Sequence, residues 1–82
     1  MSAAYLTRVD PARNMARFYK LDVQPTLFGE FAVVKEWGRI GSAGQVRSSA
    51  FPTPAEAYAA LARYKAVKER RGYGERYNVI TL

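Results

Sequence analysis

Residues 30–44 read EFAVVKEWGRIGSAG, and this stretch decides the fold. Its first part alternates between the two sides of an extended chain. One side carries Phe31, Val33, Lys35 and Trp37, and the other carries Ala32, Val34 and Glu36. Alternation with a period of two predicts a β-strand over residues 30–37. The second part, Gly38–Gly44, contains three glycines, which predicts a loop where another backbone or a ligand can come close.

Similar alternating segments lie on both sides of this stretch. We expect strands over residues 4–9 and 15–23, joined by a turn over residues 10–14. A break with Pro and Gly near its ends, residues 24–29, separates the second strand from the third. Residues 45–51 are Ser-rich and weakly apolar, as is typical of a strand at the edge of a sheet. Short connections between consecutive strands predict an antiparallel meander.

A helix over residues 53–71 is the clearest local feature. Thr53, Pro54 and Glu56 have the spacing of a capping box with proline at the first helical position. Strong helix formers follow, and Gly72 stands where a helix-ending glycine belongs. The expected buried stripe consists of Ala57, Leu61 and Tyr64, with Tyr58 and Lys68 at its margins.

These elements together predict an α+β fold, in which an antiparallel sheet of four to five strands packs against one long helix. The tail over residues 77–82 is apolar enough to add a short strand or to pack across the sheet. The sequence has no internal repeat, low-complexity tract or linker, so we expect one domain over residues 1–82.

The composition excludes several classes of chemistry. The 82 residues contain no Cys, which excludes disulfide frameworks, Cys-ligated zinc and thiol catalysis. They contain no His, which removes the usual general base and imidazole ligand. The seven carboxylates are scattered without the spacing of an acid/base pair or a metal site. We therefore predict that the protein is not an enzyme and uses no cofactor or metal.

No apolar run approaches the length of about 20 residues that spans a bilayer, and no signal peptide is visible. We expect no membrane partner and a cytoplasmic location, in contact with the nucleoid if the partner is DNA. Thirteen basic against seven acidic residues give a formal charge of +6, which attracts polyanions and equally serves solubility. Charge alone directs attention to the helix end, where Lys65, Lys68, Arg70 and Arg71 also complement the helix dipole.

The Trp37–Gly41 motif, WGRIG, resembles the signature of the WGR domain family, which is named after its first three residues. The resemblance covers about residues 5–73. It includes, in the order of the family, Phe18–Leu21, Phe31–Val34, Gly44–Gln45, Phe51, Glu56–Ala57, Lys68 and Gly72–Tyr73. The family includes domains of DNA-dependent poly(ADP-ribose) polymerases and free-standing bacterial proteins, to which this chain is similar.

The resemblance implies a sheet packed by a helix and binding to nucleic acid, with DNA as the expected partner. It places Trp37 on the sugar of a terminal nucleotide, and gives Arg39 a bridging role toward neighbouring domains that has no partner within this chain. Physical chemistry agrees, because an exposed aromatic ring stacks on any base and a guanidinium binds phosphate with two donors. The expected nucleic-acid-binding residues are Trp37, Gly38, Arg39, Lys35, Arg47, Lys65, Lys68, Arg70 and Arg71.

Several alternatives remain open at this point. Trp37 is either a core residue or a contact residue, and Arg39 either binds phosphate or holds the carbonyls of the glycine loop. Lys68 either faces a ligand or lays its stem on the sheet. The competing function is that of a protein-interaction adaptor that docks onto a separately encoded enzyme through Trp37 and Arg39. Two copies could also pair through the edge strand over residues 45–51.

Overall fold

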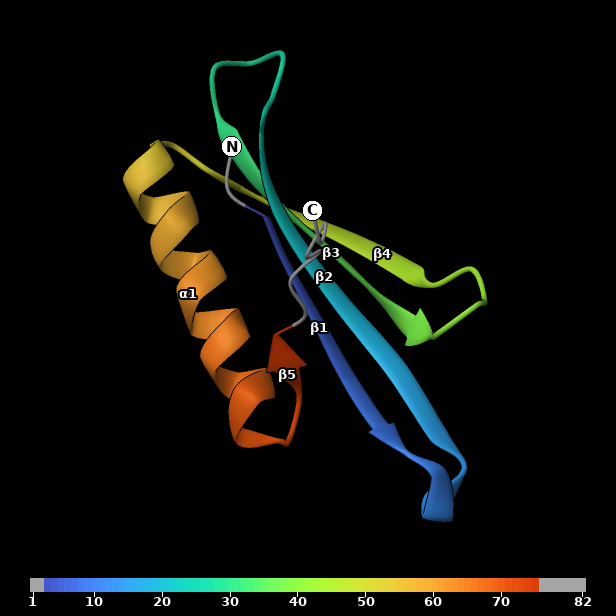
Figure 1. The fold of residues 1–82 in the computed structure, drawn as a ribbon. Coiled ribbons are helices and arrows are strands. Elements are labelled where there is room, and N and C mark those ends of the chain that lie inside the picture. The colour runs from blue at the N-terminus through green and yellow to red at the C-terminus, as the bar shows by residue number, and fades with distance from the viewer. Residues whose placement is uncertain (1–2, 76–82) are drawn as a thin grey trace, which may run out of the picture.

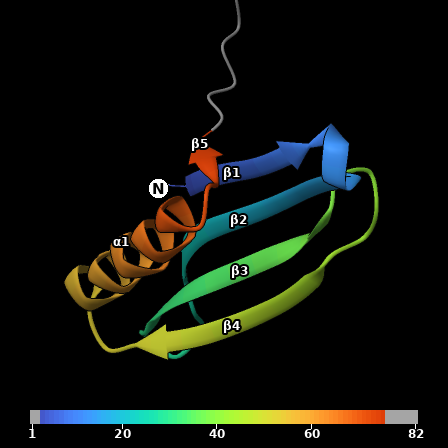
Figure 2. The same cartoon turned by 90° about the horizontal axis from the view of Figure 1, so that it is seen from below.

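The structure is a computed structural model, and it describes residues 3–75. Within these residues, five strands form one sheet, and one long helix lies against one of its faces (Figures 1 and 2). The helical elements are a short 3-10 turn η1 (Pro11–Arg13) and the helix α1 (Pro54–Arg70). The strands are β1 (Ala3–Asp10), β2 (Met15–Pro25), β3 (Phe31–Arg39), β4 (Gln45–Phe51) and β5 (Gly74–Glu75). The predicted α+β fold is confirmed.

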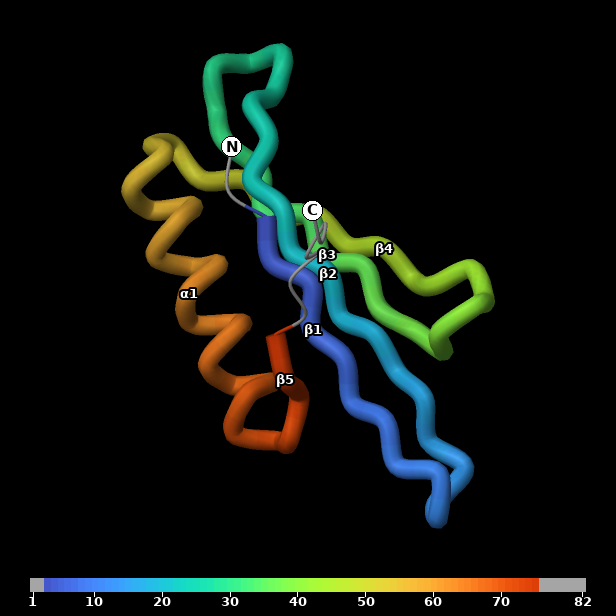
Figure 3. The backbone as a smooth tube through the Cα atoms, viewed as in Figure 1, coloured from blue at the N-terminus to red at the C-terminus, as the bar shows by residue number. Residues whose placement is uncertain are grey.

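The sheet has the order β4-β3-β2-β1-β5, and every neighbouring pair is antiparallel. β4 therefore lies at an edge, as its weak hydrophobicity predicted. The helix α1 follows β4 and crosses back over the sheet. The chain then pairs β5 with β1, at the edge of the sheet opposite β4 (Figure 2). Two long hairpins extend the sheet beyond the two ends of α1, one at the β2–β3 loop and one at the β1–β2 turn (Figure 3).

The hydrophobic core lies between the sheet and α1. Alternate residues of the central strands face the helix and are buried, and the largest fully buried side chains are Leu6, Leu21, Val23 and Val33. From the helix, the buried residues are Ala57, Ala60 and Leu61, with Tyr64 packed against them at partial exposure. Small Ala side chains let the helix backbone approach the sheet closely.

Both ends of α1 follow local rules. Thr53 caps the first turn, because its hydroxyl oxygen accepts a hydrogen bond from the Glu56 N–H at 3.2 Å. The same hydroxyl donates to the Glu56 carboxylate at 3.1 Å, so this carboxylate contacts the cap side chain. At the other end Gly72 has φ of +93°, and the Tyr73 N–H donates to the Lys68 carbonyl at 3.1 Å. This Schellman turn reverses the chain and directs Tyr73 back toward the sheet.

The boundaries of β3 correct one expectation. The strand continues through Gly38 and Arg39, which pair with Phe18 and Arg17 of β2. Gly38 was expected in the glycine loop, but the hydrogen bonds of the hairpin extend past the glycine and keep it in the strand. Trp37 consequently stands inside a strand, with strand residues on both sides. The expected tail over residues 77–82 lies outside the described residues. Within residues 3–75, the one long helix is neither long nor apolar enough to cross a membrane.

Candidate nucleic-acid interface

Two adjoining hollows open on the helix-facing side of the sheet, beside the C-terminal half of α1. One, of about 360 Å³, is lined by Tyr19, Lys35, Trp37, Arg47 and Lys68. The other, of about 510 Å³, is lined by Arg17, Phe18, Trp37, Gly38, Arg39, Lys68 and Tyr73. We call the two together the cationic groove. They share Trp37 and Lys68, which therefore stand at its centre.

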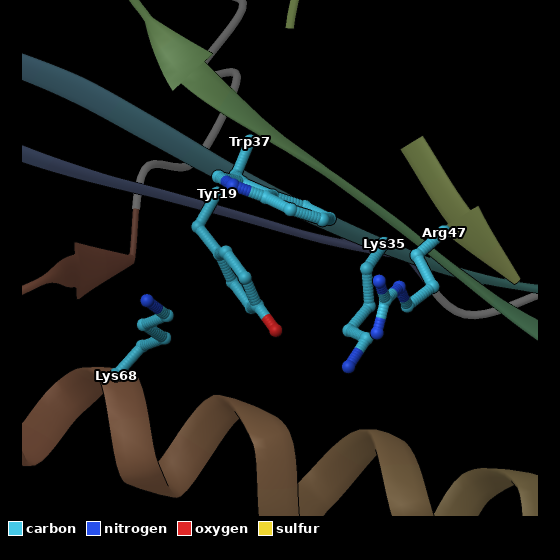
Figure 4. Close-up of a pocket in the computed structure, with 5 residues that line it drawn as sticks. All are labelled: Tyr19, Lys35, Trp37, Arg47 and Lys68. Carbon is cyan, nitrogen blue, oxygen red and sulfur yellow. The ribbon is translucent and has the colours of Figure 1, made fainter. Parts of the chain in front are cut away.

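Strand register explains why these side chains meet. Tyr19 of β2 is directly opposite Trp37 of β3, and Lys35 of β3 is opposite Arg47 of β4. Paired residues share one face of an antiparallel sheet. Figure 4 shows the four strand residues on the side of α1, with Lys68 reaching toward them from the helix. Tyr19 is buried, whereas Trp37 is half-buried and packs against the core while it lines both hollows.

Within residues 3–75, the cations of the groove have no acidic partner. Its lining includes two Lys and three Arg and no Asp or Glu. Among residues 3–75 the ion pairs join Arg13 to Asp10 at 3.5 Å and Lys65 to Glu75 at 2.8 Å, and both lie outside the lining. An anion that enters this groove therefore meets five positive charges and no carboxylate that repels it.

Like charges also stand directly opposite one another on this face. Lys35 pairs with Arg47 across β3 and β4. Arg17 pairs with Arg39 across β2 and β3, and with Arg8 across β1 and β2. Like charges in directly opposed positions destabilise a sheet, each such pair by a fraction of 1 kcal/mol. The protein therefore keeps a row of repelling cations that does not serve the stability of the isolated domain.

Lys68 is the helix contribution to the groove. Its Nζ lies 4.8 Å from the ring centre of Tyr19 and 5.2 Å from that of Tyr73, both within cation–π range. Burial lowers the pKa of Lys68, and the neighbouring charges of Arg71, Arg17 and Lys35 lower it further. Each of these causes disfavours the ammonium form, and a bound anion would relieve the repulsion.

Tyrosine rings complete the walls of the groove. Tyr73 meets Tyr19 edge to face, with ring centres 6.3 Å apart, and Lys35 Nζ lies 4.2 Å from the ring centre of Tyr64. Burial raises the pKa of Tyr19, and Tyr64 and Tyr73 raise it further. The phenol of Tyr19 is therefore neutral at physiological pH and can donate or accept a hydrogen bond in the groove. The aromatic rings around Lys35 and Lys68 orient these ammonium groups without neutralising them.

The side chain of Arg39 makes hydrogen bonds to a partner other than the glycine-loop carbonyls that were considered from sequence. Its guanidinium donates to the Asn14 carbonyl at 3.1 Å and to the Asn14 side-chain oxygen at 3.3 Å. The glycine loop is therefore not its partner, and Arg39 ties the end of β3 to the β1–β2 turn. A guanidinium has five N–H donors, and these two bonds leave others available for a phosphate oxygen.

Close backbone contact at two glycines holds the strand that carries Trp37. A Cβ atom on Gly44 would overlap the Trp37 carbonyl oxygen and lie 2.8 Å from Phe18 Cζ. A Cβ atom on Gly38 would lie 3.0 Å from the Gly44 Cα. The β3–β4 loop thus packs directly onto β3 at this point, and any larger residue would displace it. A close approach of another backbone was expected in the glycine loop, and here the β3–β4 loop and β3 approach each other in this way.

The structure brings together part of the set of residues expected from sequence. Trp37, Gly38, Arg39, Lys35, Arg47 and Lys68 line the groove. The remaining three do not line it: Lys65 is paired with Glu75, and Arg70 and Arg71 are exposed at the helix end. Arg71 still acts on the groove through the pKa of Lys68.

Sequence reasoning missed part of the lining, namely Arg17, Phe18, Tyr19 and Tyr73. Arg17 and Tyr19 lie on the same side of one alternating strand, so this alternation could have identified them. Tyr73 packs against the core while it also lines the groove.

Comparison with known proteins identifies the family. The WGR domain model matches residues 2–80. An uncharacterized protein from Sinorhizobium fredii, y4dW, is 39% identical over 72 residues, which are 88% of this chain and 35% of that protein. A crystal structure of a protein from Bacteroides fragilis superposes with a TM-score of 0.77 at 24% identity, over 93% of this chain and 20% of that one. The chain thus spans about a third or less of these longer relatives.

The helix-covered antiparallel sheet, the groove around the Trp-Gly-Arg motif and the match over nearly the whole chain lead to one assignment. WGR domains are non-catalytic modules generally regarded as binding nucleic acid. This protein belongs to the WGR domain family.

Proposed function

We propose that the chain binds nucleic acid, and DNA in particular, in the cationic groove, and that it catalyses no reaction. It contacts the sugar-phosphate backbone and strand ends with little base specificity. The observation that carries this proposal is the set of like-charged pairs on the groove face, Lys35 with Arg47 and Arg17 with Arg39. Closely spaced cations that lack carboxylate partners match the repeated negative charges of a phosphate backbone.

Trp37 supplies the contact that distinguishes a nucleotide from another polyanion. Its ring is half-buried, so one part is fixed by the core and the other faces both hollows. An aromatic ring fixed in this way can stack on a sugar or an unpaired base without ordering a flexible side chain. Stacking contributes about 1–3 kcal/mol per base and is tolerant of sequence. Neighbouring Lys35 and Lys68 are placed to hold the phosphates on either side of that nucleotide.

Low base specificity follows from the elements that form the groove. Its polar groups are mainly Lys and Arg ammonium and guanidinium groups and tyrosine phenols, and among the described residues its lining contains no Asn or Gln that would pair with adenine edges. The helix α1 packs on the sheet by its Ala57, Ala60 and Leu61 face, and its other side is rich in Ala. It therefore lacks the cluster of base-reading side chains that a recognition helix presents to the major groove.

The direct test uses Trp37 as its own reporter, because it is the single Trp of the chain. Purified protein is titrated at low salt with blunt, nicked and single-stranded DNA and with a matched RNA, and Trp emission is recorded with anisotropy of the labelled oligonucleotide. We expect saturable quenching of Trp37 together with binding, and a steep loss of affinity as salt rises. Absence of both signals at low salt would contradict the proposal and favour protein docking through Trp37 and Arg39.

Variants then assign the contact. Trp37→Ala should weaken binding about 10–100-fold, as expected for the loss of a stacking platform. Arg39→Ala should weaken binding less, since two of its donors already hold Asn14. Circular dichroism and thermal unfolding of each variant separate lost contact from lost fold. If Trp37→Ala unfolds the domain, Trp37→Phe keeps an aromatic ring and provides the comparison. Lys20→Gln, on the opposite face, is the control for a change of charge alone.

A further inference from the structure

The loop between β2 and β3 exposes two large apolar side chains at its tip. Leu27 is 99% exposed and Phe28 is 88% exposed, whereas the other exposed large hydrophobic residues of the described chain range from 38% to 63%. The two are adjacent in sequence and stand at the end of the long β2–β3 hairpin, beyond the N-terminal end of α1 (Figure 3). Exposed apolar residues are common singly, but an adjacent pair of this size at a projecting end is typical of an interaction site.

Hydrogen bonds fix the shape of this tip. The Thr26 N–H donates to the Glu30 carbonyl at 2.8 Å and closes the loop. The Thr26 hydroxyl oxygen accepts from the N–H groups of Phe28 and Glu30, both at 3.2 Å. The loop is therefore ordered from within although its side chains make no core contact. A preformed tip loses little conformational entropy when a partner covers it.

The charges around the tip are opposite to those of the cationic groove. No Lys or Arg occurs from Asp22 to Glu30, and the exposed Glu30 follows the apolar pair by two residues. The tip and Trp37 are also at opposite ends of β3, separated by six residues of strand, or about 20 Å. A polyanion bound in the groove is therefore neither attracted to the tip nor required to reach it.

We propose that the Leu27–Phe28 tip is a second binding site, which inserts into an apolar cavity with a basic rim on a protein partner. Leu27 and Phe28 are the anchors, and Glu30 faces the basic rim. This proposal does not depend on the proposed nucleic-acid function, because it uses a different end of the molecule. A protein that carries both sites joins a nucleic acid at one end to a protein at the other.

The described surface argues against other occupants. A second copy of this chain carries the same charge of +6, so two copies repel one another. Basic residues beside the apolar ones strengthen binding to an anionic membrane surface, and residues 22–30 contain none. A protein cavity can combine apolar walls with a charged rim. Such a cavity complements the apolar pair and the carboxylate of the tip.

The test starts with a photo-crosslinking amino acid at position 28 in the full chain, and at Val46 as an exposed apolar control. A partner captured at position 28 alone is identified, purified and titrated against the purified chain. We expect Leu27→Ser combined with Phe28→Ser to weaken that binary affinity at least about 100-fold. Glu30→Lys should weaken it about tenfold. Lys20→Gln should leave it unchanged, and the Leu27/Phe28 double variant should bind DNA like the wild type.

Five results would overturn the proposal. The first is that no protein is captured specifically at position 28, and the second is that the purified partner binds the double variant as tightly as wild type. The third is flotation with phosphatidylcholine/phosphatidylglycerol vesicles that depends on Leu27 and Phe28, which would identify a membrane contact. The fourth is a loss of DNA affinity in the double variant, which would make the tip part of the nucleic-acid site. The fifth is unchanged or tighter partner binding by Glu30→Lys, which would show that the cavity of the partner has no basic rim. Failure of DNA binding in the wild type would leave these measurements intact.

Discussion

The two faces of the sheet are built from the same strands but carry their charges differently. On the groove face, cations oppose cations, as in Lys35 with Arg47 and Arg17 with Arg39. On the opposite face, Lys20 pairs with Glu36 across β2 and β3, and the small hollow there is lined by Lys20, Asp22, Gln24, Val34 and Glu36. One face thus alternates charge sign, as a solvated surface does, whereas the other concentrates a single sign.

The unfavourable charge pairs lie at the proposed nucleic-acid site. The arrangement with Lys20 opposite Glu36 is the one that stabilises an antiparallel pair, and it is available to the same strands. The groove face has the unfavourable arrangement at the place where Trp37 is accessible. Repulsion between like charges that is confined to one cavity is expected where a ligand of opposite charge compensates for it.

The largest expected effect comes from reversing charge on one face at a time. Arg17→Glu combined with Arg47→Glu should weaken DNA binding at least about 100-fold, because two charge-assisted phosphate contacts become repulsive. Lys20→Glu combined with Thr7→Glu, which adds acidic groups to the opposite face, should change affinity by no more than about threefold at moderate salt. Fluorescence anisotropy at matched salt measures both. Equal losses would show that only net charge matters and that the two faces do not differ.

A change within the glycine contact should mainly affect stability. Gly44→Ala places a Cβ against the Trp37 carbonyl and the Phe18 ring, so we expect the free energy of unfolding to fall by about 1–3 kcal/mol. Gly74→Ala is the matched control, because a Cβ there meets open space. Urea denaturation of the two variants gives the comparison. Similar unfolding midpoints would contradict the close packing of the β3–β4 loop.

Replacing Lys68 should separate binding from stability. Lys68→Gln should weaken DNA binding about tenfold and reduce the slope of log affinity against log salt by about one, as for one lost phosphate contact. The melting temperature should not fall, since burial and like charges disfavour the ammonium of Lys68 in the free protein. Lys20→Gln provides the same loss of charge on the opposite face. A marked loss of stability in Lys68→Gln would mean that this side chain serves packing.

The smallest expected effect is a change in the titration of Lys68 itself. In the free protein its pKa lies below the ordinary lysine value, and a phosphate nearby should raise it by offsetting the charges of Arg17, Lys35 and Arg71. The carbon shift of its terminal methylene, followed by NMR with and without an oligonucleotide, reports this pKa. Arg17→Gln should raise it in the free protein. Identical titrations with and without DNA would place the nucleic acid away from Lys68.

Between the low folded pKa of Lys68 and the ordinary value of an unfolded lysine, the unfolded chain binds more protons than the folded one. Lys68 therefore contributes a rise in the free energy of unfolding as pH increases through this interval. The contribution should disappear in Lys68→Gln, which thermal melts at several alkaline pH values can show.

Most of the fold was predictable from sequence because its signals are local. Alternation along β3 sets which residues share a face, and Thr53 and Gly72 set the two ends of α1. These depend on backbone sterics and hydrogen bonds between residues close in sequence. The end of β3 was missed because Gly38 weakens a strand when considered alone, and only its pairing with Phe18 of β2 keeps it in the sheet.

The site was predictable only in part. The sequence alone determined that the chain is basic, lacks Cys and His, and carries Trp37 and Lys35 on one side of a strand. Only the tertiary structure decided that Arg17 and Tyr19 join them, that Arg39 holds Asn14, and that Lys68 closes the groove while Lys65 does not. Which residues of a strand share a face follows from their order in the sequence. The register between strands and the placement of the helix, in contrast, result from core packing among residues far apart in the chain. The position of the cations relative to one another therefore depends on the core of the whole domain.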